Sequence, residues 1–187
     1  MHYLYAFGLL VPEKRFDQAI EEFRVALSLD PLSPIMNTNY AATLMDAHRY
    51  PEALAQFQKT VERDPTFGPA HYKLAHLYAA TGEFQNAVSE LKRFVSAPGS
   101  SAPESWSGDA KGLRDLALYA FHSREQTTWV ALALSVTGEP NKALDYLEKA
   151  VSNQEIEVVL CLRYPSFDPI RSDPRYKAIV ARLGLPE

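Results

Sequence analysis

A sequence pattern that recurs with a period of about 34 residues constrains what this chain can fold into. An aromatic residue precedes an alanine by three positions at Phe16–Ala19, at Tyr50–Ala53 and at Phe84–Ala87. A second large apolar residue follows each alanine by four positions, and the first two copies end in Asp-Pro. This period fits two helices of about 12–14 residues joined by short turns. A single hairpin of that size cannot bury its apolar face alone, so we expect neighbouring copies to stack.

The pattern resembles the tetratricopeptide repeat (TPR), whose unit is a helix–turn–helix. In that family, positions 8, 20 and 27 of the repeat are small, so that paired helices can approach closely. Here positions 8 and 20 are Ala41 and Ala53 in one copy and Ala75 and Ala87 in the next. The resemblance implies an all-α fold, a right-handed TPR superhelix with an inserted helix and C-terminal capping helices.

The spacing of the copies predicts one TPR domain over residues 1–187. Ala143 marks the last copy and follows Ala87 by well over one period, which leaves an insertion at roughly Ser96–Phe121. The first helix is one residue short of the pattern when it is measured to Ala19. We therefore expect repeats at about 1–33, 34–67, 68–97 and 124–157, a linker and extra helix at 98–123, and a capping segment at 158–187.

Proline, glycine and Asp-Pro signals set the expected ends of the helices. Asp168-Pro169 and Asp173-Pro174 each predict an N-cap followed by the first helical residue. Gly82 and Gly138 predict left-handed helix ends. The expected helices are His2–Val11, Arg15–Leu29, Pro34–His48, Pro51–Arg63, Pro69–Thr81, Phe84–Ser96, Asp109–Phe121, Gln126–Val136, Pro140–Ser152, Gln154–Arg163 and Pro174–Leu183.

Composition argues against several classes of protein. The net charge is −4 and no basic run stands out, so we expect no nucleic-acid partner. No apolar stretch is long enough for a spanning helix, so we expect no membrane partner. Cys161 is the single cysteine, which leaves no disulfide within the chain and favours a reducing, cytoplasmic location.

The residues that carry chemistry form no recognisable catalytic or metal pattern. His71 and His76 are five apart on an expected helix and point about 140° away from each other, so they cannot share a metal ion. No nucleophile lies on a glycine-flanked turn, and the glycines are isolated. We therefore expect a protein that is not an enzyme, with no catalytic residue, no cofactor and no metal.

The resemblance places one candidate site in the concave groove, which helix A of each repeat lines. Some TPR proteins grip a peptide C-terminal carboxylate there with Lys, Asn and Arg residues from three repeats. Only Asn39 matches that set, with Lys73 able to replace the Arg, while Pro69 stands at a Lys position. A carboxylate clamp is therefore not expected, but an extended or helical peptide could still bind. The candidate groove residues are Ile35, Thr38, Asn39, Met45, Tyr72, Lys73, His76 and Trp129.

The tail carries a second resemblance. Residues Arg163–Tyr176, followed by Leu183–Pro186, are similar to the C-terminal end of TPR regions in large bacterial proteins with winged-helix, Ser/Thr kinase or adenylate-cyclase-like domains. This similarity implies a protein-protein interaction module, the C-terminal regulatory or scaffold part of a bacterial signalling protein. Two alternatives remain. One is self-association as a homodimer through the aromatic-rich first helix, and the other is small-molecule sensing near Trp106, Tyr119 and Trp129.

Overall fold

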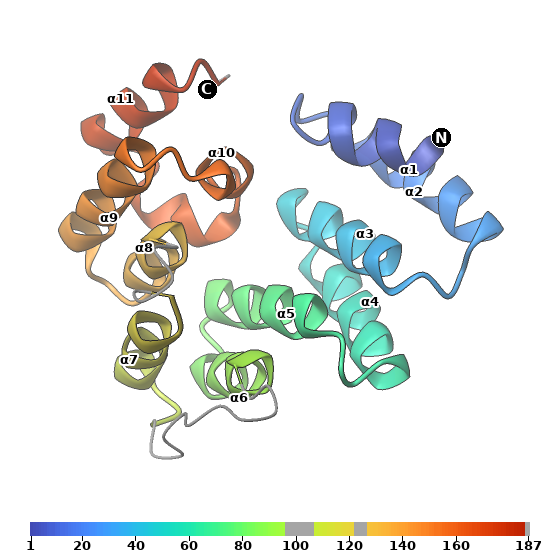
Figure 1. Cartoon of the computed structure of the whole chain (residues 1–187), viewed down its shortest axis with the longest axis horizontal. Helices are drawn as coiled ribbons and strands as arrows, with labels where there is room; N and C mark the ends of the chain where they lie inside the picture. The colour runs from blue at the N-terminus through green and yellow to red at the C-terminus, as the bar shows by residue number, and fades with distance from the viewer. Residues whose placement is uncertain (96–106, 122–126, 186–187) are drawn as a thin grey trace. The chain divides into compact units, whose positions relative to one another are not determined.

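The computed structural model describes residues 1–95, 107–121 and 127–185, and all the regular structure within these ranges is helical (Figure 1). The predicted all-α class is confirmed. The predicted linker and the predicted first residue of the eighth helix, Gln126, lie outside the described residues. The elements are α1 (His2–Tyr5), the π-helix η1 (Ala6–Leu10), α2 (Phe16–Leu29), α3 (Pro34–Asp46), α4 (Tyr50–Arg63), α5 (Gly68–Ala80), α6 (Phe84–Val95), α7 (Ala110–Phe121), α8 (Thr127–Val136), α9 (Pro140–Ser152), α10 (Ile156–Cys161), the 3-10 helix η3 (Pro165–Ile170) and α11 (Pro174–Arg182).

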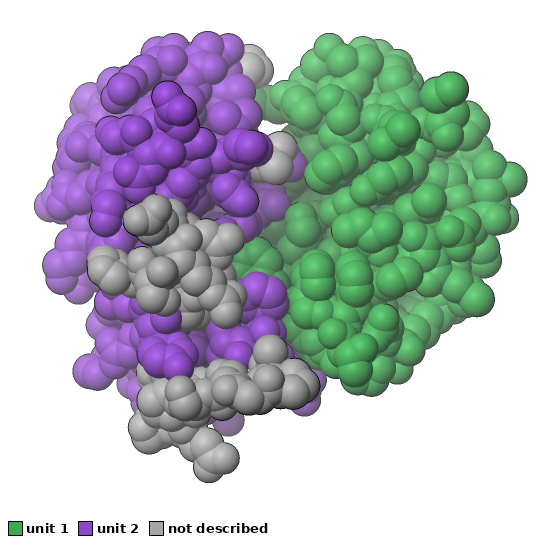
Figure 2. Space-filling model, in the orientation of Figure 1, with its two compact units in different colours: residues 1–77 green, residues 78–187 purple. Residues whose placement is uncertain are grey.

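The chain divides into two compact units, residues 1–77 and residues 78–187 (Figure 2). In the first unit α1 and η1 pack on α2, α2 packs on α3, and α3 pairs with α4. The predicted small positions are buried, as close packing of helices requires: Ala41 and Ala53 are both 0% exposed. The equivalent alanines elsewhere are also buried: Ala75 is 3% exposed, and the value is 0% for Ala6, Ala19, Ala87, Ala131 and Ala143.

The first helix, predicted to be one residue short of the pattern, has one residue more than the equivalent helix of the next repeat, and the π-helix η1 accounts for it. The corresponding buried alanines of the first two repeats are Ala6 with Ala19 and Ala41 with Ala53, and the first pair is separated by one position more than the second. The extra residue is taken up where the backbone N–H of Val11 donates to the carbonyl of Ala6, five positions earlier, at 3.0 Å. A π-turn inserts one residue into a helix without breaking it. The predicted first helix therefore forms, as α1 followed by η1, and both of these segments pack on α2.

The first helix of each repeat ends in the same left-handed turn. Lys14, His48 and Gly82 have φ values of 59°, 57° and 81°, and each lies one full repeat after the one before. The residue after each one donates its N–H back to a carbonyl five positions earlier, for example Arg49 to Leu44 at 2.9 Å. The left-handed ends predicted at Gly82 and Gly138 are confirmed. In the first two repeats, side chains with a Cβ occupy a backbone conformation that glycine adopts more easily.

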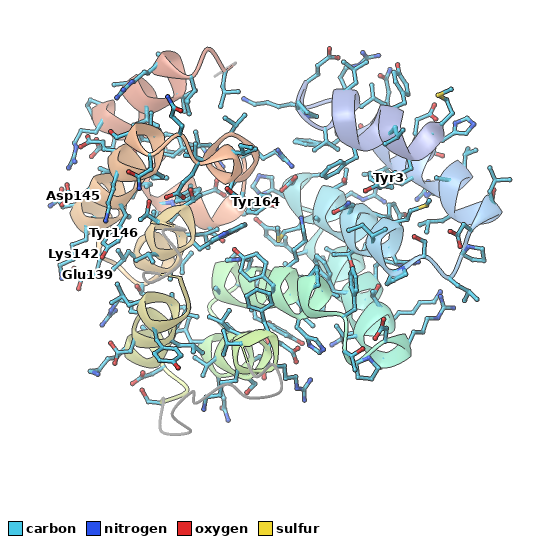
Figure 3. The ribbon with its side chains drawn as sticks, viewed as in Figure 1. Tyr3, Glu139, Lys142, Asp145, Tyr146 and Tyr164 are labelled. Atoms are coloured by element: carbon cyan, nitrogen blue, oxygen red, sulfur yellow. The ribbon has the colours of Figure 1, made fainter. Side chains whose placement is uncertain are left out.

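In the second unit, the predicted extra helix is α7, which packs against both α6 and α8. The α8–α9 hairpin follows, and the capping elements η3 and α11 pack on α8 and α9 respectively. Arg175 of α11 donates to Asp145 at 2.7 Å and to Glu148 at 2.9 Å, both on α9 (Figure 3 labels Asp145). These contacts fix the last helix against the hairpin before it.

Glu155 closes the amino end of α8 from a distant point in the sequence. Its carboxylate accepts the backbone N–H and the hydroxyl of both Thr127 and Thr128, at 2.6–3.0 Å. These donors belong to the first turn of the helix, where N–H groups lack partners within the helix. Burial raises the pKa of Glu155, but the four hydrogen bonds outweigh it and hold that pKa below its usual value of 4.5.

One of the two Asp-Pro predictions in the tail is wrong. Asp173 does cap α11, since its side chain accepts the N–H of Arg175, and Pro174 is the first helical residue. Asp168 and Pro169, however, lie inside η3 rather than at a helix start. The Asp168 carboxylate is instead bound by the side chain of Arg171 at 2.8 Å. The Asp-Pro pair alone does not determine whether the aspartate caps a helix or binds a nearby arginine.

Arg171 organises the turn that contains η3. Its guanidinium donates to the carbonyls of Leu162, Arg163 and Tyr164 at 3.1–3.2 Å. The hydroxyl of Tyr176 donates to the same Leu162 carbonyl. Carbonyls left over at the end of α10 thus find partners in the capping segment, which ties that segment to the rest of the unit.

Candidate partner-binding surface

The four candidate groove residues on α3 have different environments. Ile35 is 42% exposed at the start of the helix. Thr38 and Met45 are 0% exposed and Asn39 is 4% exposed, so these three side chains belong to the interior. Of the four, Ile35 is therefore the one whose side chain can meet a partner without rearrangement.

Asn39 is engaged by the first helix. Its side-chain amide donates to the hydroxyl of Tyr3 at 2.9 Å, and Figure 3 labels Tyr3 on α1. The Tyr3 ring is stacked on Phe7, with centroids 6.0 Å apart, and meets Phe23 edge-on at 5.9 Å. Asn39 is the one residue that matches the carboxylate clamp. Its side-chain amide N–H is used for a hydrogen bond within the fold.

Other polar side chains of α3 also bond within the unit. Asn37 donates to the carbonyls of Pro31 and Ser33, and its own oxygen accepts from Gln56 of α4. Thr43 donates to the carbonyl of Asn39 at 2.8 Å. The bonds of Asn37 join α3 to α4 and to the turn before it, and the bond of Thr43 lies within α3, so all of them serve the fold rather than a ligand.

The candidates on α5 pair with each other. The rings of Tyr72 and His76 meet edge-on with centroids 4.4 Å apart, and both side chains are buried, at 6% and 8% exposure. Burial, with a smaller effect from Lys73, lowers the pKa of His76 from 6.5 to about 3. The imidazole is therefore uncharged at neutral pH. Lys73 is half-buried and carries the formal charge on this part of α5.

The eighth candidate, Trp129, belongs to the second unit, on α8, and is half-buried. The other seven lie in residues 1–77. Of the three aromatic residues considered for a small molecule, Tyr119 is 44% exposed on α7, and Trp106 lies outside the described residues. Among the residues that the structure describes, no group of three or more His, Cys, Asp or Glu side chains could hold a metal ion.

The first helix, which the sequence suggested for self-association, has exposed apolar side chains. Leu4, Tyr5 and Leu9 are 67%, 41% and 44% exposed. Counted from the equivalent alanines Ala6 and Ala41, Tyr3 has the place on the first helix that Thr38 has on α3. The sequence indicates this apolar face, because the stretch from Tyr3 to Leu10 has no polar side chain except the tyrosine hydroxyls.

No helix in the described ranges is long and apolar enough to cross a bilayer.

Two family models match the chain, and both describe the tetratricopeptide repeat. One matches residues 13–66 and the other residues 44–98. Together they take in α2 to α6, where the repeating pattern is most regular. The resemblance drawn from the repeating residues is confirmed.

Curated relatives match less than half of this chain. The Hsp70-Hsp90 organizing protein of Triticum aestivum is 30% identical over 79 residues, which is 42% of this chain and 14% of that protein. The TPR repeat-containing thioredoxin TTL4 of Arabidopsis thaliana is 36% identical over 76 residues, 41% of this chain and 11% of that protein. This chain thus spans less than a sixth of the length of either relative.

A solved structure that superposes on this chain is the crystal structure of MamA protein. It is 18% identical, covers 99% of this chain and 95% of its own, and superposes with a TM-score of 0.48.

Proposed function

Because this chain is a tetratricopeptide repeat protein, we propose that it is a non-catalytic module that binds a protein or peptide partner through the first-helix faces of its repeats. The observation that carries the proposal is the surface of α3 and α5 in the first unit. There Ile35 is exposed and Lys73 is half-exposed, on helices whose neighbouring side chains are already packed. A surface held rigid by stacked hairpins needs little ordering on binding.

The chemistry of this surface favours one type of ligand. An exposed isoleucine on α3 and a half-exposed lysine on α5 suit a peptide with an apolar side chain and an acidic group. A free C-terminal carboxylate is a poor fit, because Asn39 is buried and bonded to Tyr3. The name of the wheat relative links that protein to two chaperones, and we do not extend this link to a chain that lacks most of the clamp.

A peptide selection tests the proposal. The whole chain is screened against a random peptide library, and the selected peptides are titrated against variants. Ile35→Glu and Lys73→Glu should each weaken binding by about tenfold or more, which is the loss expected from about 1.4 kcal/mol. Asn39→Ala and Tyr72→Ala are less informative because both residues are buried.

Ile156→Glu is the matched control, since Ile156 is 76% exposed on α10 in the other unit. It should leave peptide affinity unchanged. If the selection returns no peptide whose affinity depends on Ile35 or Lys73, the proposed surface is wrong.

We also propose that the module is the C-terminal part of a bacterial signalling protein. The support is the resemblance of the tail, from Arg163 to Tyr176, to such regions. The DNA upstream of this coding sequence decides the matter. An output domain in the same reading frame would support the proposal, and a different kind of neighbouring domain would refute it.

A further inference from the structure

The junction between the first two repeats carries exposed aliphatic side chains that the next junction lacks. The first junction is residues 29–35, from the end of α2 to the start of α3 (Figure 1), and the second is residues 63–69, one repeat later. At equivalent positions, the first has Leu29, Leu32 and Ile35 where the second has Arg63, Thr66 and Pro69. The three aliphatic side chains are 77%, 72% and 42% exposed, so burial within the fold does not account for them.

The exposure belongs to these positions of the repeat. Arg63, Thr66 and Pro69 are exposed as well, although the first repeat precedes the helices that they join. A further repeat before the first would therefore leave Leu29 and Leu32 exposed. Single exposed apolar residues are ordinary, but a group of them marks an interaction surface.

Hydrogen bonds hold the first junction in one compact conformation. The side-chain amide of Asn37 donates to the carbonyls of Pro31 and Ser33, at 3.1 Å and 2.8 Å. Leu32 lies between these two residues, so its backbone is fixed against the first turn of α3. Three residues of chain span at most about 11 Å, which keeps each of the other two aliphatic residues within that distance of Leu32. We call this group the junction patch, and it comprises Leu29, Leu32 and Ile35.

A positive charge lies beside the junction patch. The guanidinium of Arg63, the last residue of α4, donates to the Pro31 carbonyl at 3.1 Å, which places it against the same turn. Lys59 is exposed about one helical turn earlier on α4. Asp30 is exposed in the turn itself and carries the opposite charge. An acidic ligand is therefore attracted by Arg63 and repelled by Asp30, and these two effects can be separated by substitution.

We propose that the junction patch binds apolar side chains of the peptide partner and that an acidic residue of this peptide pairs with Arg63. The inference rests on the proposed function, because Ile35 belongs to both surfaces and connects the patch to α3. It identifies the partner as a segment in which an acidic residue neighbours two or more apolar ones. A guanidinium can bind a carboxylate through two parallel N–H groups. Leucines on a turn that is already fixed need little ordering on binding.

Peptides selected from a library of mixed apolar and acidic sequences are titrated against the whole chain. Leu32→Thr, which gives the first junction the residue of the second, should weaken binding by about fivefold to tenfold. Arg63→Glu should weaken it by at least as much, and Asp30→Asn should strengthen it by about twofold. Ile156→Thr, the control at an exposed isoleucine of the other unit, should leave the affinity unchanged.

Urea unfolding separates lost binding from lost folding. Because the Leu32 side chain is 72% exposed, Leu32→Thr should unfold at nearly the same urea concentration as the unchanged chain. An unchanged affinity for the Leu32→Thr chain would overturn the junction patch.

Reversing the charge on both partners tests the pairing with Arg63. Each acidic residue of a selected peptide is replaced in turn by lysine. One of these peptides should bind the Arg63→Glu chain about fivefold more tightly than it binds the unchanged chain. If none shows this preference, Arg63 is not the partner of the acidic residue.

The outcomes distinguish this inference from the proposed function. If affinity falls with Ile35→Glu and Lys73→Glu but not with Leu32→Thr or Arg63→Glu, the junction patch is wrong and the surface of α3 and α5 stands. If the selection returns no peptide, or peptides that depend on none of these residues, both are wrong.

Discussion

The backbone N–H of Val11 donates to the carbonyl of Ala6, five positions earlier, at 3.0 Å. This one bond lets a helix with an extra residue keep its alanine at the same buried position as Ala41 of the next repeat. The left-handed residues Lys14 and His48, one full repeat apart, then show that the register is restored by the end of the helix.

Deleting Gly8 should therefore be tolerated. The deletion shortens the separation of Ala6 and Ala19 to that of Ala41 and Ala53 in the next repeat, and it allows an unbroken α-helix. The free energy of unfolding in urea should change by about 1 kcal/mol or less.

The matched control is deletion of Ala42, which lies one repeat after Gly8 in a helix with no spare residue. It turns half of α3 by about 100° and should cost about 3 kcal/mol or more, because buried side chains such as Thr38 leave their sites. Equal losses from the two deletions would contradict the assignment of the π-turn as the extra residue.

Gln154→Gly should stabilise the chain. Gln154 is exposed and has a φ of 57°, a conformation that costs an L-residue about 1 kcal/mol more than glycine. Thermal unfolding should show a gain of roughly 0.5–1 kcal/mol, reduced in part by the greater freedom of glycine in the unfolded chain. The reverse change, Gly82→Ala, should destabilise, although a Cβ at Gly82 meets no atom within 4 Å. If Gln154→Gly instead lowers the stability of the chain, backbone strain at residue 154 is not what limits the stability of this turn.

Arg171→Lys should destabilise the capping segment although the charge is kept. A lysine cannot bind the carbonyls of Leu162, Arg163 and Tyr164 together, because that requires the forked guanidinium. We expect a loss of about 1–3 kcal/mol in urea unfolding. Arg182→Lys, at an exposed position of α11, should change stability little. Similar effects from both substitutions would mean that the carbonyl contacts contribute little.

His76 should make the protein sensitive to acid. Its pKa is about 3 in the folded chain and 6.5 when unperturbed, so the unfolded state binds a proton more readily. The stability that depends on a neutral His76 is complete above pH 6.5 and is lost as the pH falls from 6.5 towards 3, by on the order of 4 kcal/mol.

Urea unfolding at several pH values checks this effect. In His76→Gln the fall in stability over that range should be smaller than in the unchanged chain. His48→Gln, at an exposed histidine, controls for the loss of an imidazole. If the two variants show the same pH dependence, His76 is not the group responsible.

The sequence by itself determined the helices and their pairing. Aromatic and alanine residues recurring at a fixed period predicted the hairpins, and most predicted boundaries lie close to those observed, because helix caps and apolar periodicity are local signals. Tertiary structure decided which candidate residues are accessible. Thr38, Asn39 and Met45 are buried because partners distant in the sequence, such as Tyr3, reach them. It also decided how the first repeat absorbs its extra residue, since α1 and η1 both pack on α2 while the π-turn between Ala6 and Val11 takes up that residue.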